Sequence, residues 1–357
     1  MRLRTPAVVL VLATLLGPAC GKKGPILPPL ILRPQPVESL RAVQRGGRVL
    51  LEWENPKTSI DGTGLSGIAE VEVWLETRPD PPPPKAPPLA DDFSARARRV
   101  GTVVPAAGEE TSSTDWALDP AGWKGRLYVF AVRVRESRKR RLSDFSNEAA
   151  VRPRAAPLPP SDAKARVYED RVEIGWTDPV RNFDGSAPAA VAGIVVYRSE
   201  ANGPTETRTP APVRGPVFVD RDFLFGRTYR YVLRAAMTGG AALVESDDGP
   251  ALEVKPVDTF PPAVPAALSI AAGPDFLTLV WDASPAMDLA GYHVWRRPAG
   301  SGEFVRLTAA PILETTYTDR AVDKGRPYEY VVTAVDAAGN ESPRSAPVVQ
   351  LIKDLPT

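Results

Sequence analysis

Cys20 is the residue whose type and position point most directly to a chemical step. It is the only cysteine in the 357-residue chain, and it follows the short apolar stretch 7–16. A basic start, a short apolar stretch and small residues before a cut site are typical of a secretory signal peptide, whereas a transmembrane helix needs roughly 20 apolar residues. The sequence therefore predicts that residues 1–19 are a secretory signal peptide that is removed after Ala19.

The residues around Cys20 resemble the lipobox of bacterial lipoproteins. In that family the cysteine thiol takes a diacylglyceryl group, and the new amino terminus usually receives an acyl chain such as palmitate. The resemblance therefore implies that a lipid is attached to the Cys20 thiol. Gly17 and Pro18 depart from the family pattern, and the residues leave open an ordinary signal peptide that is cut near Ala19 or Gly21. Gly21 stands where enteric lipoproteins retained at the inner membrane carry aspartate. The resemblance therefore implies anchorage at the outer membrane of a bacterial cell envelope.

The segment after Cys20 is predicted to be a tether. Residues 22–36 contain five prolines. Because proline fixes φ and removes a hydrogen-bond donor, we expect residues 20–36 to be extended. The opening Cys20-Gly21-Lys22-Lys23-Gly24-Pro25 also resembles the start of the small lipopolysaccharide-assembly lipoproteins, which implies a partner of lipopolysaccharide export as one alternative function.

The rest of the chain offers few groups for catalysis. His293 is the only histidine, and it lies between Tyr292 and Val294 on a predicted strand. Nucleophilic catalysis or a transition-metal site would need further histidine or thiol groups, and the chain has none besides Cys20. We expect His293 to be an outward or half-buried strand residue. The sequence predicts no catalytic residue, no cofactor and no metal site. The number of carboxylates is too large for catalysis by a pair of carboxylates to be excluded by counting alone.

Two loops place oxygen-bearing side chains near an Asp-Gly pair. They cover residues 55–62 and 178–185, and the third repeat described below keeps only Asp282 and Asp288. Carboxylate and amide oxygens at such spacing suit Ca²⁺, whereas Asp-Gly alone favours a tight turn. We favour the turn, and the sequence leaves calcium binding open.

A basic run covers residues 133–141 and ends in Arg138, Lys139, Arg140 and Arg141. These four cations are predicted to lie at the tip of a hairpin, with Arg96, Arg98 and Arg99 nearby. Such a group suits the phosphates of anionic lipids or lipopolysaccharide, and a solvated hairpin tip is the alternative. The sequence predicts no nucleic-acid partner, because the chain is expected to be secreted and its 44 basic residues balance 43 acidic residues.

Three similar segments position these groups. Each begins with a strand that carries a tryptophan followed by a proline turn, and the tryptophans are Trp53, Trp176 and Trp281. Each later has a strand introduced by Gly-Arg, in which Tyr128, Tyr229 and Tyr328 recur about every 100 residues, the size of one small sandwich domain. Apolar and polar residues alternate within the strands, as in half-buried β-structure.

These motifs resemble fibronectin type III domains, most clearly in the Ala-Val-Asp-Ala-Ala-Gly-Asn-Glu-Ser hairpin at 334–342. The resemblance implies an all-β chain of three tandem immunoglobulin-like sandwiches. It also implies that Tyr128, Tyr229 and Tyr328 form tyrosine corners, each hydroxyl bonding back to the backbone. The predicted domains cover residues 37–153, 157–256 and 262–352.

Proline marks the predicted boundaries and one insertion. Short proline-rich linkers at 152–160 and 257–265 favour an extended rod of domains. The stretch from Trp53 to Tyr128 is longer than its counterparts, and the excess at 79–99 includes a proline run that cannot join a central strand. We expect this insertion to be an exposed loop.

The sequence thus favours a non-enzymatic envelope lipoprotein that presents its domains for protein binding, adhesion or spacing. An accessory polysaccharide-binding protein is the alternative, and exposed tryptophans outside the core set would support it. The candidates for such a role are Trp74, Trp116, Trp123 and Trp295. The identity of the ligand, periplasmic or surface exposure and the oligomeric state stay open.

Overall fold

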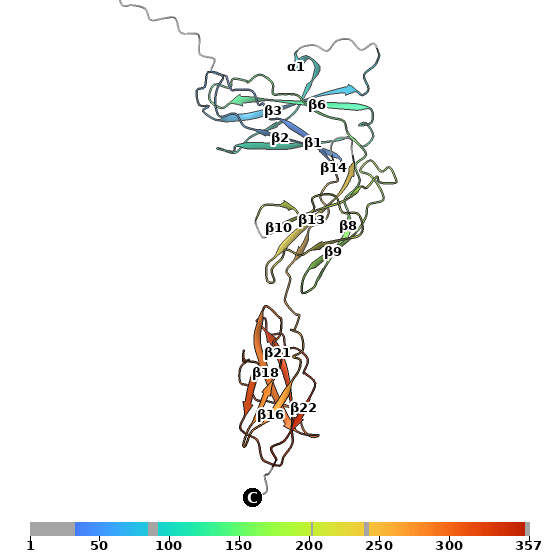
Figure 1. Cartoon of the computed structure of the whole chain (residues 1–357). Helices are drawn as coiled ribbons and strands as arrows, with labels where there is room; N and C mark the ends of the chain where they lie inside the picture. Colours follow the sequence, from blue (N-terminus) through green and yellow to red (C-terminus); the bar gives the residue numbers. More distant parts are fainter. Residues whose placement is uncertain (1–32, 85–91, 201–202, 239–242, 354–357) are drawn as a thin grey trace, which may run out of the picture. The chain divides into compact units, whose positions relative to one another are not determined.

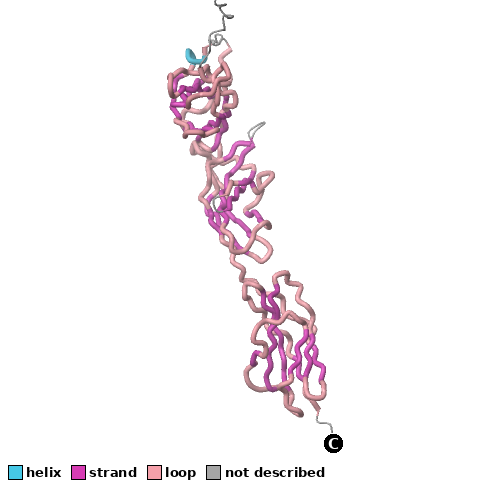
Figure 2. Tube along the Cα trace, turned by 90° about the vertical axis from the view of Figure 1, so that its left-hand side faces the viewer, coloured by secondary structure: helices cyan, strands magenta, loops and turns pink. Residues whose placement is uncertain are grey.

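A computed structural model describes residues 33–84, 92–200, 203–238 and 243–353. Cys20 and residues 20–32 of the predicted tether lie outside the described residues, as does the predicted signal peptide. Strands form nearly all the regular structure, and within the described ranges the only helix is the four-residue α1 (Phe93–Arg96) (Figure 2).

The described part of the chain contains no helix with the length and apolar character that a membrane crossing requires.

The first sandwich has two facing groups of strands (Figure 1). Three strands are neighbours in one sheet, namely β1 (Arg41–Arg45), β2 (Arg48–Glu54) and β5 (Thr111–Ala117). The other sheet has the order β4-β3-β6-β7, with β4 at Arg98–Val103, β3 at Ile68–Pro79, β6 at Arg126–Glu136 and β7 at Ala149–Val151.

The second and third sandwiches repeat this arrangement. In the second, the three-stranded sheet contains β12 (Val217–Asp220), β9 (Val172–Thr177) and β8 (Ser161–Val167). Its other strands are β10 (Gly193–Glu200), β11 (Glu206–Thr207), β13 (Tyr229–Thr238), β14 (Leu243–Glu245) and β15 (Leu252–Val254). The prediction of an all-β chain of tandem fibronectin type III-like sandwiches is confirmed by this strand order.

The third sandwich is built in the same way. Its smaller sheet contains β16 (Ser269–Ala272), β17 (Leu277–Val280) and β20 (Thr316–Asp319). Its larger sheet has the order β19-β18-β21-β22, with β19 at Val305–Arg306, β18 at Leu289–Pro298, β21 at Tyr328–Asp336 and β22 at Val348–Gln350.

Strand alternation places the predicted tryptophans in the cores. In β2, Val49, Leu51 and Trp53 are buried, while Glu52 between them is exposed. Trp176 and Trp281 are likewise buried, at 7% and 3% exposure. Burying a large apolar side chain stabilises a fold by roughly 1.5–3 kcal/mol, so these strands supply much of the packing of each sandwich.

The predicted tyrosine corners are seen at Tyr229 and Tyr328. The Tyr229 hydroxyl accepts a hydrogen bond from the Leu224 amide at 2.8 Å. The Tyr328 hydroxyl accepts one from the Asp323 amide at 3.4 Å and donates to the Asp323 carboxylate at 3.0 Å. Tyr128 is buried in β6 at the corresponding position. These bonds fix the chain as it enters the late strand of the larger sheet.

The insertion at 79–99 is not simply an exposed loop, so that prediction was wrong in part. Residues 85–91 lie outside the described ranges, but Phe93–Arg96 form α1 and Arg98 begins β4. Asp92 caps α1 by accepting from the Ser94 amide at 2.9 Å. Phe93 is buried against Phe145, with ring centroids 5.3 Å apart. Burial of this one aromatic ring, which polar and proline neighbours conceal in the sequence, orders the end of the insertion.

The described residues pack as two compact units. The first consists of the residues up to Ala42 together with Leu51–Thr114 and Leu127–Val151. The second consists of Val43–Leu50, Asp115–Arg126 and the residues from Arg152 onward. Within the second unit, Arg45 of β1 pairs in parallel with Glu245 of β14, and Arg48 binds Asp247 at 2.8 Å. Two short pieces that precede Arg152 in the sequence therefore pack with residues that follow it.

Candidate functional site

The outer face of the β3-β4-β6 sheet carries a group of charged side chains from three strands. Alternation in β3 turns Val71 and Val73 inward and leaves Glu70, Glu72 and Trp74 on the opposite face. β6 contributes Arg133 and Arg135 to the same face, and β4 contributes Arg99. Arg99 therefore meets the start of the basic run on the sheet, at Arg133 and Arg135, whereas the sequence analysis expected it near the tip of the hairpin.

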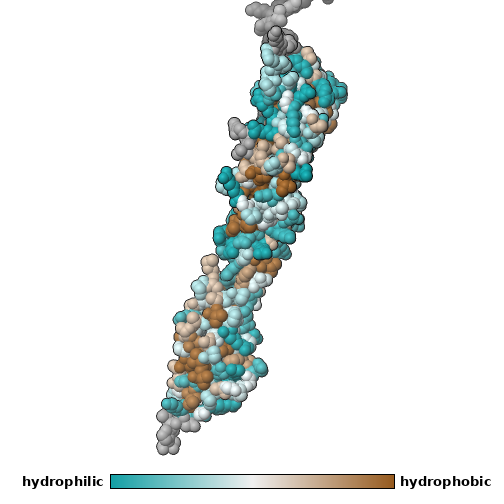
Figure 3. Space-filling model, turned by 90° about the vertical axis from the view of Figure 1, so that its right-hand side faces the viewer, coloured by the Kyte–Doolittle hydropathy of each residue, from teal (hydrophilic) through white to brown (hydrophobic). Residues whose placement is uncertain are grey.

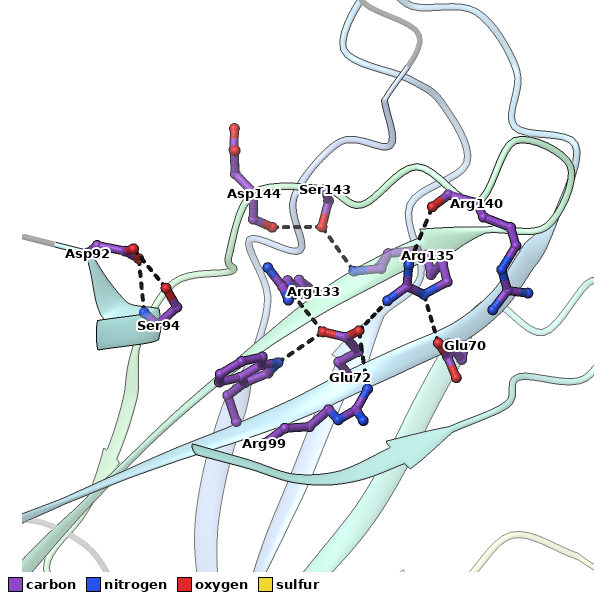
Figure 4. Close-up of polar contacts among 12 residues, drawn as sticks. Glu70, Glu72, Asp92, Ser94, Arg99, Arg133, Arg135, Arg140, Ser143 and Asp144 are labelled. Carbon is purple, nitrogen blue, oxygen red and sulfur yellow. Dashed lines mark hydrogen bonds and ion pairs between the residues drawn. The ribbon is translucent and has the colours of Figure 1, made fainter. Parts of the chain in front are cut away.

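Glu72 lies at the centre of this group and is only 1% exposed. Its carboxylate accepts from Arg133 Nε at 2.7 Å, from Arg135 Nη2 at 2.5 Å and from Trp74 Nε1 at 3.1 Å. Arg99 Nη1 lies 3.5 Å from the same carboxylate. Figure 4 shows these side chains converging on Glu72 from the neighbouring strands, with Arg135 also bound to Glu70. We call this group the Glu72 cluster.

The Glu72 cluster keeps a buried carboxylate ionised. Burial opposes ionisation, but hydrogen bonds from Arg133, Trp74 and Arg135 outweigh it and hold the pKa of Glu72 below its ordinary value. The Arg133 guanidinium also lies 4.9 Å from the Trp74 ring centroid and 5.0 Å from that of Phe145. Cation–π contacts of this kind add to the ion pairs, so these arginines are committed to the fold.

A second ion-pair group extends the same pattern. Glu76 is buried and binds Arg78 at 2.6 Å and Arg96 at 3.0 Å, and Arg96 also reaches Glu148 at 2.8 Å. Arg96 therefore does not add free positive charge to the basic run, which corrects one of the possibilities drawn from the sequence. Arg99, Arg133 and Arg135 are neutralised in the same way.

The end of the basic run is different. Ser137, Arg138 and Lys139 form the turn after β6, and the Glu136 amide donates to the Arg141 carbonyl at 2.9 Å. Arg138, Lys139, Arg140 and Arg141 are all exposed. Across the described ranges, none of the four side chains forms an ion pair. The predicted hairpin tip is confirmed, and we call these four residues the basic tip.

The loops beside the basic tip enclose a cleft of about 640 Å³. Loop 55–67, residues 105–110 and Ser137 line it, and the exposed pair Lys57–Glu110, 2.6 Å apart, lies on its wall. Next to it, Glu136 is buried and accepts from the Ser66 hydroxyl at 2.9 Å. The cleft therefore presents a mixed polar and apolar surface formed largely by loops.

The two Asp-Gly loops form turns. Asp61 accepts from the Thr63 amide at 3.1 Å and from its hydroxyl at 2.7 Å. Asp184 makes the equivalent bonds to Ser186 at 3.0 and 2.5 Å, and the Ser186 hydroxyl is the main reason why the pKa of Asp184 lies below its ordinary value. Neither loop brings three carboxylates together in the part of the chain that the structure covers.

The first residue of each loop accepts a hydrogen bond from a core tryptophan. Trp53 Nε1 donates to Asn55 at 3.2 Å, and Trp176 Nε1 donates to Asp178 at 2.9 Å. In the third sandwich the corresponding position is Ala283, and Trp281 Nε1 has no hydrogen-bond partner among the residues that the structure describes. Asn55 and Asp178 are therefore indole acceptors, a role that the repeat of Trp followed two residues later by Asn or Asp could have indicated.

The structure brings together one carboxylate group that the sequence analysis missed. Among the described residues, oxygens of Asp258, Asp288 and Asp336 lie within 4.8 Å of one another. Carboxylate oxygens are ligands that suit Ca²⁺ by type. The buried Asp336 carboxylate, however, accepts from the amide and the side chain of Asn340, both at 2.8 Å. Asp258 accepts from the Phe260 amide at 3.2 Å. The bonds of Asp336 shape the hairpin that follows β21, and the bond of Asp258 shapes the segment before the third sandwich.

None of the four tryptophans outside the cores is exposed. Trp123 is 8% exposed and packs against Phe183, with ring centroids 5.8 Å apart. Trp74, Trp116 and Trp295 are half-buried. Trp295 lies under Arg344, 5.0 Å from the ring centroid, and donates to Thr333 at 3.1 Å. The exposed aromatic platform that would favour polysaccharide binding is not formed by these residues.

His293 is more buried than predicted. It lies on the outward face of β18 but is only 6% exposed, because Thr308 and Trp295 cover it. Its Nδ1 is 2.9 Å from the Thr308 hydroxyl. Burial lowers the pKa of His293 below 6.5, Arg306 lowers it further and Glu341 opposes the shift.

We expect acid to destabilise the third sandwich through His293. Its pKa in the folded state lies below the ordinary value of 6.5. Between the two values the unfolded chain binds more protons, so stability falls as the pH drops, by up to about 1.4 kcal/mol per pH unit. Denaturation of the full chain at several pH values, followed by hydrogen exchange in β18, should show this slope. In His293→Gln the slope should disappear, and an unchanged slope would assign it to other groups.

The chain is similar in sequence to parts of large carbohydrate-active enzymes. It is 30% identical over 273 residues to exoglucanase B of Cellulomonas fimi, which covers 71% of this chain and 22% of that protein. It is 31% identical over 165 residues to an amylopullulanase of Thermoanaerobacter thermohydrosulfuricus, which covers 45% of this chain and 10% of that protein. The chain therefore spans less than a quarter of the length of these relatives. No protein-family model matches it.

Among solved structures, the chain is similar to the crystal structure of the chicken CNTN1 FN1-FN3 domains. The alignment covers 90% of this chain and 99% of that one, with 15% sequence identity and a TM-score of 0.27.

Proposed function

We propose that this chain is a non-enzymatic lipoprotein of the bacterial cell envelope. In this proposal Cys20 carries the lipid, and the tandem sandwiches bind other proteins, mediate adhesion or act as spacers at the outer membrane. The observation that carries the proposal is that buried ionisable groups form hydrogen bonds and ion pairs with other side chains of the fold. Glu72 is held by arginines, Asp319 by Arg296 and Tyr330, and His293 by Thr308. Loops and sheet edges are therefore the surfaces that face a partner.

Sheet edges support a role in protein binding. β12 is the last strand of its sheet, and its Val217 and Val219 are 43% and 40% exposed. An edge strand offers unpaired backbone groups to an added strand, and apolar side chains can add affinity. The face drawn in Figure 3 mixes hydrophilic residues with smaller hydrophobic patches. Partners would therefore be held by several limited contacts rather than by one broad apolar surface.

The anchor is tested by metabolic labelling with a fatty-acid analogue in cells that express the wild type or Cys20→Ser. We expect the wild type to be labelled and to fractionate with the outer membrane. The serine variant should lose the label and appear in the soluble periplasm, because no thiol remains to be acylated. Membrane fractionation that is identical for the two chains would contradict the anchor.

An accessory polysaccharide-binding protein is the second candidate, favoured by the similarity to exoglucanase B and the amylopullulanase. The burial of Trp123 and the half-burial of Trp74, Trp116 and Trp295 argue against an aromatic sugar platform. Retention of the purified chain on insoluble cellulose or starch would support this candidate, whereas retention equal to that of an unrelated protein would exclude it. The only support for a partnership in lipopolysaccharide export is the sequence motif that begins at Cys20.

A further inference from the structure

The basic residues discussed in the first unit fall into two groups, those paired with acids and those left unpaired. On the sheet and the adjoining α1, Arg96, Arg99, Arg133 and Arg135 are all paired with glutamates. At the hairpin, the basic tip places four consecutive cations in solvent, and no acid among the described residues pairs with them. In Figure 4 the Arg140 guanidinium lies away from Glu72, and only its backbone carbonyl is contacted. The unpaired charge is thus concentrated at one point.

The backbone conformation of Arg140 gives a second reason to expect that its charge is used in a contact. Arg140 has a φ of +52°, a left-handed conformation that glycine or asparagine adopts at lower cost. The position carries arginine nevertheless. Local turn geometry therefore does not explain the residue type at this position, whereas a contact that uses its charge would.

The chain enters the first sandwich at the same end as the basic tip. The Ile60 amide donates to the Arg33 carbonyl at 3.0 Å, which joins the start of the described chain to loop 55–67. The Arg33 guanidinium binds Asp144, just after the tip, at 2.8 Å. The Ser137 amide, at the start of the turn, donates to the Gly67 carbonyl at 3.0 Å. Arg33, loop 55–67 and the tip are therefore neighbours.

The length of chain before Arg33 limits how far this end can be from an anchor. The dozen residues from Gly21 to Leu32 reach at most about 40 Å when fully extended. They include Lys22 and Lys23 and no acidic residue. If Cys20 is lipidated, the end of the first sandwich that carries the basic tip is therefore the end joined to the membrane anchor.

We propose that the basic tip docks on the anionic phospholipid headgroups of the membrane that holds the chain. The geometric step rests on the proposed Cys20 anchor, while the affinity for headgroups belongs to the tip itself. Phosphate-bearing headgroups match unpaired arginine and lysine in charge and in hydrogen-bonding capacity. Each basic residue near such a surface strengthens partitioning by about fivefold. Docking would fix the orientation of the sandwich relative to the membrane, which a tether alone does not.

The test uses the full mature chain with Cys20→Ser, so that acyl chains cannot mask the contribution of the tip. Binding is measured by co-sedimentation with vesicles of phosphatidylcholine alone and of phosphatidylcholine mixed with phosphatidylglycerol. We expect selective binding to the mixed vesicles that weakens as salt rises, because screening shortens the range of the attraction. Replacing Arg138, Lys139, Arg140 and Arg141 by serine should weaken this binding roughly 100-fold or more.

The matched control removes the same number of exposed cations elsewhere. Lys164→Ser, Arg166→Ser, Lys255→Ser and Lys324→Ser, combined in one chain, change the net charge equally and leave the tip intact. This control should bind the mixed vesicles like its parent. Equal loss in both variants, or equal binding to the two kinds of vesicle, would overturn the docking proposal. Because these chains carry no lipid, the result is independent of whether fatty-acid labelling supports the anchor.

Discussion

Glu72→Gln should lower the free energy of unfolding of the first unit by about 3 kcal/mol. The change keeps the shape of the side chain but removes the charge that faces Arg133 and Arg135, at 2.7 and 2.5 Å. Removing one partner of a buried ion pair typically costs about 3–5 kcal/mol, because the remaining charge is left uncompensated. We expect the lower end, because the two arginine side chains are 24% and 21% exposed.

The effect is measured by hydrogen exchange of the full chain in rising urea, with peptides from β3 and β6 reporting on the first unit. A single global transition would be a poor measure, because separate units need not unfold together. Glu52→Gln is the control, since Glu52 is exposed on β2 and its loss should change stability by less than about 0.5 kcal/mol. If the two variants are equally stable, the Glu72 cluster does not hold the sheet together.

Acid should act on the same cluster. The pKa of Glu72 is lowered in the folded state from an ordinary value of 4.5. Its contribution is therefore complete above that value and is lost as the pH falls through the lowered pKa, where the folded state must take up a proton. In Glu72→Gln this part of the acid-induced loss of stability in β3 should be absent. The comparison therefore separates the contribution of the ion pairs from that of the packing of Trp74.

Asp319→Ala is expected to destabilise the third sandwich by about 3–5 kcal/mol. Asp319 is 3% exposed, and its carboxylate accepts from Arg296 at 2.7 Å and from the Tyr330 hydroxyl at 2.8 Å. It also accepts from the Ala321 amide at 2.9 Å. Truncation leaves a half-buried guanidinium, a buried hydroxyl and a backbone amide without their acceptor, and each such loss is costly.

The second sandwich provides an internal comparison for this prediction. Asp220 is 2% exposed and accepts from Arg198 at 2.8 Å and from Tyr231 at 3.0 Å. Asp220→Ala should therefore lower the stability of the second sandwich by a similar amount. The resulting faster hydrogen exchange should be confined to β9, β12 and β13. The exposed Asp275 is the control in the third sandwich, and Asp275→Asn should have almost no effect. A loss in Asp319→Ala no larger than in this control would show that the carboxylate is dispensable.

The sequence by itself determined the strands, the repeat and the core residues of the sandwiches. Alternation in β2 and β9 identifies which side chains face inward, because successive residues of a strand point to opposite faces. Trp53, Trp176 and Trp281 are buried as predicted, and Tyr229 and Tyr328 form the expected corners. These features depend on patterns within a few consecutive residues, which is why they can be recognised without the fold.

The function of the charged residues could not be determined in this way. The run at 133–141 is continuous in the sequence, yet the structure divides it into paired arginines on β6 and the unpaired basic tip. The partners of Arg133 and Arg135 are Glu70 and Glu72, which lie on another strand. Whether a charge is neutralised therefore depends on the register between β3 and β6.

Tertiary structure alone also decided the burial of Trp123 and Phe93 and the approach of Asp258, Asp288 and Asp336. Each involves residues far apart in the sequence that lie in loops or short elements, where no period of two or of 3.6 marks the inward face. Their environment is set by which segments pack together. Local alternation thus encodes the sandwiches, whereas contacts across strands and loops determine which charged and aromatic side chains remain available to a partner.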